Sequence, residues 1–327
     1  MTSPMTEELV SIIITNHNYG TYLSTAIESA LDQTYRAIEV VVVDDGSTDG
    51  SRDVITRFGG RIVPVLQKQG GQGAAFNAGF KASRGAFICM LDADDAFLPT
   101  KVERVVEVFS RYPTAAWLRH KLVLTDEFLT PSTRSIPNFS GSSLTTIHPR
   151  LVLEHKARFV VSSGIALRRV AVLNVLPIPE DEVALWQLGA DAYVGTLSAG
   201  AGPGYSLDEI LSYYRQHRRL GTTEATTRFL ELNIRFERQI SAAWSKRFGR
   251  NVTASDVFKH SLILDALAGH PLLSRRRLDN FAAGLNALPP IALHAPSLAI
   301  RQALSLTAAF VVPRLWIKRM VGHLGFG

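Results

Sequence analysis

Residues 10–49 read VSIIITNHNYGTYLSTAIESALDQTYRAIEVVVVDDGSTD. The β-branched apolar run Val10–Thr15 predicts a strand. Apolar residues at helical spacing follow between Tyr22 and Leu31 and predict a helix. Val40–Val43 is apolar at every position, which is typical of a strand covered on both faces in a parallel sheet. The stretch therefore predicts a β-α-β unit in which both strands end in polar residues.

The same alternation of strand and helix continues to residue 112. The pattern predicts helices over 49–58, 73–83 and 100–112 and strands over 62–66 and 86–91. This order predicts an α/β fold with a mostly parallel, Rossmann-like sheet and flanking helices. Ligands of such sheets bind beyond the carboxyl ends of the strands. Those ends are Thr15–Asn18, Asp44–Ser47 and Asp92–Asp95.

Beyond Pro113 the pattern is weaker. Residues 159–167 and 205–214 contain strand-like pieces around a predicted helix over 182–198. From about residue 222 the sequence predicts helices, interrupted at 269–271 and 288–290. We therefore predict a catalytic domain over residues 1–220 and a helical C-terminal region over 221–327.

Composition excludes several classes of protein. Apolar residues make up 46% and charged residues 20% of the 327 residues, which excludes a disordered chain. The one cysteine, Cys89, excludes a disulfide framework and lies in an apolar run. The net charge is +6, but no nucleic-acid-binding module accompanies it, so we expect no nucleic-acid partner. The first residues do not resemble a signal peptide and no apolar run would span a bilayer, so a cytoplasmic protein is expected.

The acidic loop Asp92-Ala93-Asp94-Asp95 directly follows a predicted buried strand. Neighbouring carboxylates repel one another unless a cation or hydrogen-bond donors are present. Hard divalent cations such as Mg²⁺ and Mn²⁺ prefer oxygen ligands, often one or two carboxylates together with substrate phosphates. The alternative is capping of the following helix, which would explain one aspartate but not three.

Two further loops could contact a nucleotide. Residues 43–49, Val-Asp-Asp-Gly-Ser-Thr-Asp, could offer a carboxylate to a base or a ribose, or could form a turn with a helix cap. Residues 68–77 form a Gly-rich segment that enters a helix, where the backbone can approach an anionic ligand closely. Taken alone, neither loop decides between a binding and a structural role.

Together, in order and spacing, these segments resemble the family 2 glycosyltransferases of the GT-A fold. The matching stretches are residues 10–18, 22–23, 26–35, 43–49, 70–79, 91–95 and 207–217. The resemblance covers roughly residues 9–218. The joint occurrence of these stretches is specific to the family, although no single stretch is.

The resemblance implies roles for the matched positions. A nucleotide-sugar donor would be bound by Thr15, His17, Asn18, Asp45, Gly73, Asp92 and Arg215. A divalent metal, Mn²⁺ or Mg²⁺, would be held by Asp94, and His217 could reach the metal or the diphosphate. For Arg215 and His217 the alternative to a ligand contact is a solvated position at the polar end of a strand. Asn16 and His17 replace the more frequent Thr-Tyr of the family, so the preferred base stays open.

The resemblance also implies a general base, Asp191, within Gly189-Ala190-Asp191-Ala192-Tyr193. The chain departs from the family here, because Ala190 stands where Glu is common. The upstream Glu180-Asp181-Glu182 offers rivals, although an acidic first helical turn also explains that trio. Ser162-Ser163-Gly164 falls where this fold lines the acceptor cleft, and a bend between strands is its alternative explanation.

The implied function is inverting transfer of a sugar, with UDP as the default nucleotide, in polysaccharide, glycolipid or cell-envelope glycan synthesis. The acceptor would be a glycan or a lipid-linked molecule. Residues 301–324 combine apolar and basic side chains, which is typical either of a helix on an anionic membrane surface or of a docked terminal helix. Peripheral contact with the inner face of the membrane is therefore one expectation. The rival functions are a nucleotidyltransferase and an inactive module that binds nucleotide sugars.

Overall fold

The structure is a computed structural model that describes residues 7–137, 139–145, 161–180, 190–216, 223–249, 262, 274–286 and 296–311. The chain divides into two compact units. One comprises Met1–Thr146 and Arg158–His217, and the other comprises Ile147–Ala157 and Arg218–Gly327. The predicted domain division after residue 220 stays a prediction.

The first unit is built on a mixed sheet. The order of its main path is β3-β2-β1-β4-β9-β6-β10-β5, with β7 paired to β6 and β8 paired to β10. The strands are β1 (Val10–Asn16), β2 (Ile38–Asp45), β3 (Val63–Gln67), β4 (Phe87–Asp92), β5 (Ala96–Phe97), β6 (Trp117–Thr125), β7 (Pro131–Ile136), β8 (Ser143–Thr145), β9 (Ile165–Arg168) and β10 (Gly204–Arg215). The sheet and its covering helices confirm the predicted α/β class.

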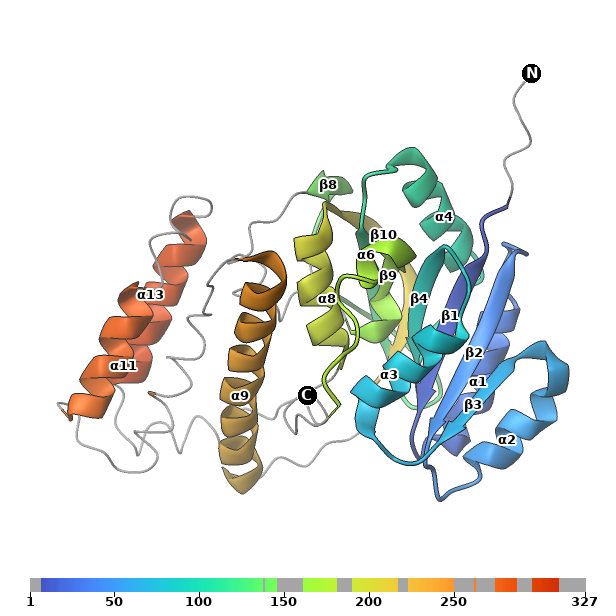
Figure 1. The fold of residues 1–327 in the computed structure, drawn as a ribbon, viewed down its shortest axis with the longest axis horizontal. Helices are drawn as coiled ribbons and strands as arrows, with labels where there is room; N and C mark the ends of the chain where they lie inside the picture. The colour runs from blue at the N-terminus through green and yellow to red at the C-terminus, as the bar shows by residue number, and fades with distance from the viewer. Residues whose placement is uncertain are drawn as a thin grey trace. The chain divides into compact units, whose positions relative to one another are not determined.

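The half formed by β3, β2, β1 and β4 is parallel, as predicted (Figure 1). Ile12 on β1 lies opposite Val40 on β2 and Cys89 on β4. All three side chains are buried, because both faces of this part of the sheet are covered. Cys89 is buried, and its thiol is not part of a disulfide.

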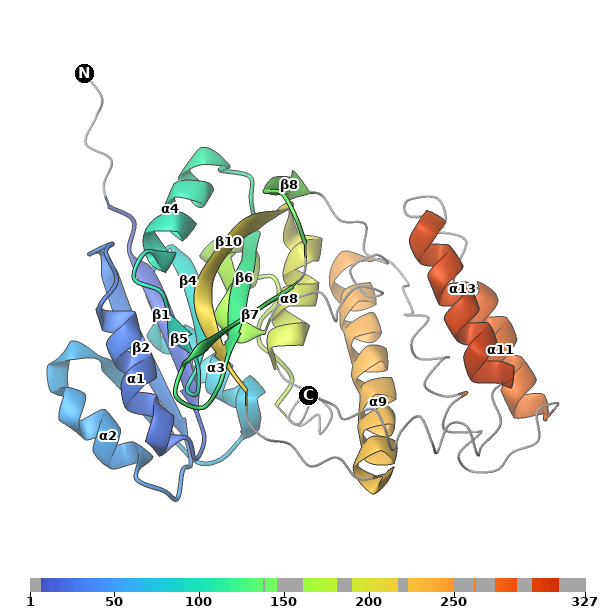
Figure 2. The same ribbon diagram turned by 180° about the vertical axis from the view of Figure 1, so that it is seen from behind.

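Helices follow the first four parallel strands at the predicted places: α1 (Gly20–Leu31), α2 (Ser51–Phe58), α3 (Gly71–Ala82) and α4 (Lys101–Arg111). The core beneath α1, α2 and α4 includes Ile12 and Ile14. On α3, Gly79 instead approaches Ile13 and Val43. Because successive residues of a strand point to opposite faces, α3 covers one face of the sheet and the other three helices cover the other (Figures 1 and 2).

The half formed by β9, β6 and β10 contains antiparallel pairs that the sequence did not predict. The pattern did not predict β6, because Arg119 and Lys121 interrupt its apolar run. Both cations lie beside the Phe139 ring, 5.0 and 5.4 Å from its centre, so their stems stay covered. Strand β9 begins at Ile165, later than predicted, because Ser162–Gly164 forms the 3-10 turn η3.

Among its described residues this unit also contains the helices α6 (Arg169–Val172) and α8 (Ala190–Ala201). Helix α8 corresponds to the C-terminal part of the helix predicted over 182–198. Residues 181–189 lie outside the described residues.

The second unit contains α9 (Thr223–Phe248), α11 (Arg275–Asn286) and α13 (Pro296–Val311). Helix α11 packs on α13 through stacked rings of Phe281 and Phe310, whose centres are 4.6 Å apart. The predicted interruptions at 269–271 and 288–290 lie outside the described residues, as does everything beyond Val311. Within the ranges given above, no helix has both the length and the hydropathy needed to cross a bilayer.

Candidate active site

The carboxyl ends of β2, β1 and β4 lie next to one another in the sheet. Thr15 on β1 lies opposite Val43 on β2 and opposite Asp92 on β4. The polar residues that follow these strands therefore share one edge, where parallel sheets bind their ligands.

Asp45 attaches the Gly-rich loop to the end of β2. Its carboxylate accepts hydrogen bonds from the backbone N–H groups of Gly70 (2.8 Å) and Gly71 (2.7 Å) and from Nε2 of Gln67 (2.7 Å). Gly71 has a φ of 85°, a conformation that suits glycine because it has no Cβ. Asp45 is only 4% exposed. Its contact with a nucleobase stays a prediction, and the structure gives it a clear role in shaping the loop.

His17 lies between the two loops. Its Nδ1 is 2.8 Å from the backbone carbonyl oxygen of Asp45, which can only accept, so Nδ1 carries the proton. Nε2 then accepts hydrogen bonds from Gln69 Nε2 (3.1 Å) and Asn18 Nδ2 (3.2 Å). Asn18 adopts a φ of 60° and accepts a hydrogen bond from the backbone N–H of Thr48 (2.8 Å). His17 and Asn18 thus form a hydrogen-bonded rim beside Asp45.

The turn-and-cap explanation fits the other two aspartates of this loop. Asp44 is fully buried and accepts hydrogen bonds from Asn16 Nδ2 and Arg52 Nε, both at 3.0 Å. Asp49 accepts from the backbone N–H groups of Gly20 (2.8 Å) and Ser51 (2.9 Å), where α1 and α2 begin. A carboxylate is favourable at the start of a helix. These two residues hold the loop, and Asp45 faces the Gly-rich segment.

The acidic loop after β4 and the start of α8 share one electrostatic environment. Burial raises the pKa of Asp92 well above its usual value, and the charges of Asp95, Asp94 and Asp191 raise that pKa further. Burial likewise raises the pKa of Asp191. The structure therefore brings together the predicted ribose-binding, metal-binding and base residues. Their mutual repulsion is what a bound cation would relieve.

Gln72 connects this acidic cluster to α8. Its Nε2 donates a hydrogen bond to Asp92 Oδ1 (3.4 Å), and its Oε1 accepts one from the backbone N–H of Ala190 (2.8 Å). Ala190 directly precedes Asp191 in the chain. Gln72 was not among the residues predicted from the sequence; its only signal was its position between the glycines of the loop.

Asp95 is a buried anchor for the same loop. Its Oδ2 accepts a hydrogen bond from Ser163 Oγ (2.6 Å), and its Oδ1 accepts one from the backbone N–H of Arg215 (2.9 Å). Ser163 Oγ also accepts from the backbone N–H of Asp92 (3.1 Å), and Arg215 Nε donates to the carbonyl oxygen of Asp94 (2.6 Å). Burial raises the pKa of Asp95 to about 8, and the charge of Asp94 adds to the rise. The bend expected at 162–164 is present, but nothing in the sequence signalled the hydrogen bonds of Ser163.

Arg215 supports the loop through its guanidinium group. Besides the bond to Asp94, it donates to the carbonyl oxygen of Glu127, and it lies 4.4 Å from the centre of the Tyr22 ring. Only 5% of the residue is exposed. A contact with the donor phosphates stays a prediction for Arg215.

Three other predictions concern the surroundings of the site. A Cβ on Gly73 would lie 3.0 Å from Ile178 Cγ2, so packing alone accounts for a glycine there, and its donor contact stays a prediction. Glu180, one of the rival bases, accepts a hydrogen bond from Asn77 Nδ2 (2.8 Å). Asp181, Glu182 and His217 lie outside the described residues.

A divalent cation fits the donor set of the acidic loop. In the described parts of the chain, no group of three or more His, Cys, Asp or Glu side chains is arranged to hold a metal ion. Mg²⁺ and related ions often take only one or two carboxylates and complete their coordination with water and substrate phosphates. Asp92 and Asp94 supply that type of ligand.

The chain belongs to glycosyl transferase family 2, because residues 11–176 match that family. It is 39% identical over 214 residues to an uncharacterized glycosyltransferase of Nostoc sp., a match that covers 64% of this chain and 65% of that protein. It is 29% identical over 220 residues to the UDP-Glc:alpha-D-GlcNAc-diphosphoundecaprenol beta-1,3-glucosyltransferase WfaP of Escherichia coli, covering 64% of this chain and 78% of that protein. The predicted family, the family 2 glycosyltransferases, is confirmed.

Solved structures confirm the GT-A fold. The chain superposes on S. aureus TarS 1–349 in complex with UDP-GlcNAc with a TM-score of 0.59 and 16% sequence identity, over 96% of this chain and 90% of that chain. The chain spans less than two thirds of the length of the first curated relatives that it matches, for example 32% of a glycosyltransferase of Rickettsia prowazekii.

Proposed function

We propose that this glycosyltransferase moves a sugar from a UDP-sugar to an acceptor hydroxyl and inverts the anomeric configuration. The observation that carries the proposal is the bridge made by Gln72, which donates a hydrogen bond to Asp92 and accepts one from the backbone N–H of Ala190, the residue before Asp191. It connects the loop that contains the candidate ribose and metal ligands, Asp92 and Asp94, to the candidate base, Asp191, which lies far from them in the sequence. Inverting transfer needs one base on the acceptor side of the sugar and one stabilised leaving group on the other.

The donor is proposed to bind along the edge formed by β2, β1 and β4. His17, Asn18 and Asp45 would meet the nucleotide, with Thr15, Gly73 and Arg215 around it. Asp94, together with Asp92, would hold Mn²⁺ or Mg²⁺, with His217 as a further candidate ligand. When bound, the cation supplies positive charge that stabilises a diphosphate leaving group. TarS, which shares the fold, binds UDP-GlcNAc, and this supports UDP as the nucleotide.

Asp191 is the proposed base. It lies in the first turn of α8, and Gln72 ties the backbone of the preceding residue to Asp92. In this role its carboxylate takes the proton of the acceptor hydroxyl while the oxygen attacks the anomeric carbon. The Gln72 bridge would keep a base at Asp191 in a fixed place relative to the proposed donor-binding loop.

The acceptor is proposed to be a glycan or a lipid-linked molecule of polysaccharide, glycolipid or cell-envelope synthesis. The name of WfaP states a lipid-linked diphosphate acceptor, which supports this class. Contact of residues 301–324 with the inner face of the membrane stays part of the proposal, and the structure describes the segment only to Val311.

A binding assay and a product assay together test the function. Thermal shifts with a panel of nucleotide sugars, with and without Mn²⁺, should show a metal-dependent rise in the melting temperature for a UDP-sugar, because a ligand of the folded state stabilises it. Asp94→Asn should remove the metal-dependent part of that rise. The unaltered chain should also release UDP from the donor. Release of pyrophosphate from a nucleoside triphosphate and a sugar 1-phosphate would instead indicate a nucleotidyltransferase, and binding of the UDP-sugar without any release would indicate an inactive module.

A further inference from the structure

The turn between β6 and β7 presents an aromatic side chain to solvent. Phe128 is 81% exposed, the largest exposed fraction of any large hydrophobic residue in the described parts of the chain. A single exposed apolar side chain is common on protein surfaces, so exposure alone does not define a site. The conformation of the turn and its connection to the acidic loop distinguish Phe128 from the other exposed apolar residues.

The turn holds Phe128 in a fixed conformation. Asp126 Oδ1 accepts hydrogen bonds from the backbone N–H groups of Phe128 (3.0 Å) and Thr130 (2.8 Å). The backbone N–H of Asp126 in turn donates to the carbonyl oxygen of Thr130 (3.2 Å). Leu129 adopts a φ of 62°, in the left-handed region that a bulky side chain rarely occupies. Such strain persists where the surrounding structure enforces it, and it is concentrated at functional sites.

The end of β6 lies at the same edge of the sheet as the acidic loop. Strand β6 runs antiparallel to β9, and β9 runs antiparallel to β4, so β6 and β4 end at one edge. Thr125, the last residue of β6, lies opposite Arg215, the last residue of the adjacent strand β10 (Figure 2). The turn that contains Phe128 therefore extends from the edge where Asp92 and Asp94 lie.

Arg215 connects this turn to the acidic loop. Its guanidinium group donates a hydrogen bond to the carbonyl oxygen of Glu127, the residue before Phe128, and its Nε donates to the carbonyl oxygen of Asp94 (2.6 Å). Arg215 is only 5% exposed, so water competes little for these bonds. One side chain thus joins the position of the Phe128 ring to that of the candidate metal ligand.

The surroundings of Phe128 suit a sugar ring better than a membrane or a second copy of the chain. The neighbouring Asp126 and Glu127 are exposed, and the negative surface of an anionic membrane would repel them. One ring is far smaller than the roughly 800 Å² that each partner of a stable protein interface buries. A pyranose has an apolar C–H face and a rim of hydroxyl groups. These features match the electron-rich face of an aromatic ring and the neighbouring carboxylates, which accept hydrogen bonds.

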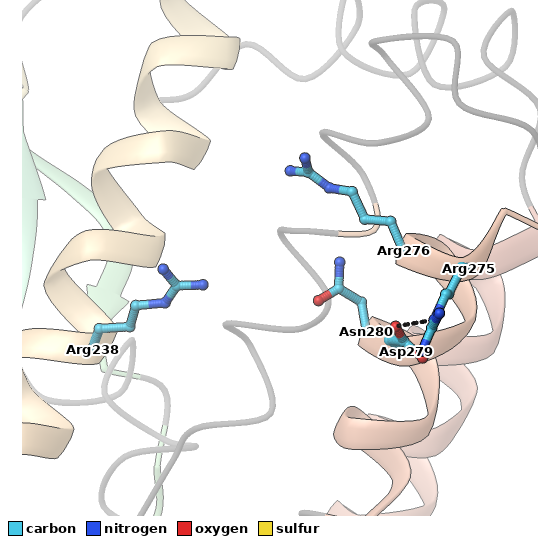
Figure 3. A pocket seen from close by; sticks show the side chains of 5 residues that line it. All are labelled: Arg238, Arg275, Arg276, Asp279 and Asn280. Carbon is cyan, nitrogen blue, oxygen red and sulfur yellow. Dashed lines mark ion pairs between the residues drawn. The ribbon is translucent and has the colours of Figure 1, made fainter.

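The pocket of the second unit offers different chemistry. It is lined by Arg238 on α9 and by Arg275, Arg276, Asp279 and Asn280 on α11 (Figure 3). These side chains end in charged or amide groups, and none of them provides a flat apolar surface. The apolar face of a sugar ring is therefore matched by Phe128 and not by this pocket.

The order of the strands separates Phe128 from the proposed donor site. The proposed nucleotide-binding loops follow β2, β1 and β4, whereas β6 lies beyond β4 and β9 in the sheet. We propose that Phe128 binds the acceptor by packing against the apolar face of one of its sugar rings. The acceptor is then a glycan or a glycolipid with a pyranose ring near the reacting hydroxyl group, and not a lipid alcohol without sugar. This inference rests on the proposed function, because it concerns the acceptor of that reaction.

Saturation-transfer NMR with simple sugars tests the proposal. The probes are the methyl β-glycosides of glucose, galactose and N-acetylglucosamine, with UDP and Mn²⁺ present to occupy the donor site. At least one glycoside should bind the unaltered chain and receive saturation at its ring C–H protons. Phe128→Ala should weaken that binding by about tenfold or more, because the apolar contact is lost. Phe128→Trp should keep the binding, and Phe128→Leu, which is apolar but not flat, should lose most of it.

The control is Leu173→Ala, which shortens a side chain that is 59% exposed and follows α6. It should change glycoside binding by less than about twofold, as is usual for surface substitutions. Equal binding by Phe128→Ala and Leu173→Ala, or no binding of any glycoside by the unaltered chain, would overturn the proposal. Binding to phosphatidylglycerol vesicles that only Phe128→Ala abolishes would also overturn it, since the ring would then contact a membrane.

Kinetics separate this inference from the proposed function. With a glycoside as acceptor and a UDP-sugar as donor, Phe128→Ala should raise the KM for the glycoside by about tenfold and change kcat little, because the contact serves binding. If sugar is transferred and that KM is unchanged, the inference fails and the proposed function stands. If the unaltered chain releases no UDP, the proposed function fails, while the NMR result still decides whether Phe128 binds a sugar ring.

Discussion

Ser163 Oγ donates a 2.6 Å hydrogen bond to Asp95 Oδ2, and both side chains are buried. The same hydroxyl oxygen accepts a hydrogen bond from the backbone N–H of Asp92. A residue that precedes β9 therefore fixes both ends of the acidic loop that follows β4. Asp95 is thus placed to orient Asp92 and Asp94, the proposed ligands of the donor and the metal.

Ser163→Ala should lower turnover by about 10- to 100-fold, as is typical when the partners of ligand-holding residues are removed. The loss should appear mainly as weaker activation by Mn²⁺, because the backbone of the acidic loop would no longer be held. The measurement is initial rate against Mn²⁺ concentration. Ser132→Ala, at an exposed position on β7, is the control and should leave the curve unchanged. If both variants behave like the unaltered chain, Ser163 has no positioning role.

Asp191→Asn should abolish sugar transfer and leave the affinity for the UDP-sugar nearly unchanged. The amide keeps the size of the side chain but cannot take a proton from the acceptor hydroxyl. Turnover and donor affinity are measured separately, by UDP release and by calorimetry. A large loss of donor affinity would show that Asp191 binds the donor and is not the base.

The first half of the sheet could be predicted from the sequence, because each strand there is apolar on both faces and each is followed by a helix with a clear inner face. Strand β6 could not be predicted in this way. Its Arg119 and Lys121 look solvated in the sequence, but contacts with Phe139, distant along the chain, cover them. Tertiary contacts of this kind leave no local pattern.

The residues of the candidate site also divide into those with a local sequence pattern and those without one. Asp92, Asp94 and Asp45 could be selected because they follow strands that end at one edge of the sheet. Gln72 and Ser163 could not, because their importance comes from hydrogen bonds to residues 20 or more positions away. A single glutamine or serine in a loop has no pattern that distinguishes it from other polar loop residues.

Gly79→Ala should lower the free energy of unfolding by about 1–3 kcal/mol, as is usual for overpacking. An added Cβ would lie 2.5 Å from Ile13 Cγ2 and 3.0 Å from Val43 Cγ2, so α3 must shift away from the sheet. Because α3 begins at Gly71, beside Asp45, the affinity for the donor should fall as well. Urea unfolding and donor titration measure the two effects.

The control for this change is Gly60→Ala. A Cβ at Gly60 would meet nothing within 4 Å, so that variant should keep both stability and donor affinity. Equal stability of the two variants would show that α3 is not packed as closely as described.

Lys101 is fully buried, and its Nζ has no hydrogen-bond partner among the described residues. Nζ lies 3.3 Å from the centre of the Phe97 ring, which offsets part of the cost of burying the charge. Burial lowers the pKa of Lys101 from 10.5 to about 8, and the neighbouring Cys89 thiol opposes the shift. Burial, and then the charge of Lys101, lowers the pKa of His120 to about 3, so that imidazole stays neutral at pH 7.

The lowered pKa of Lys101 makes stability depend on pH. Below pH 8 both the folded and the unfolded chain carry the proton, so the folded chain bears the full cost of the buried ammonium group. Between pH 8 and 10.5 the folded chain releases the proton first, so stability rises with pH in that window. Lys101→Met removes the charge and keeps an unbranched apolar chain. It should raise the free energy of unfolding by about 1–3 kcal/mol at pH 7.

Urea unfolding of the Lys101→Met variant and of the unaltered chain at pH 7, 8.5 and 10 tests this expectation, with the midpoint compared at each pH. The gain from the substitution should be largest at pH 7 and should shrink toward pH 10, because the buried lysine becomes neutral in the folded chain. Lys81→Met, at an exposed position on α3, controls for the loss of a cation and should show no such trend. Since tyrosines and other lysines also titrate in this range, the difference between the two proteins at each pH is the quantity that matters. A gain that stays constant with pH, or a loss of stability at pH 7, would mean that the ammonium group of Lys101 is compensated within the fold.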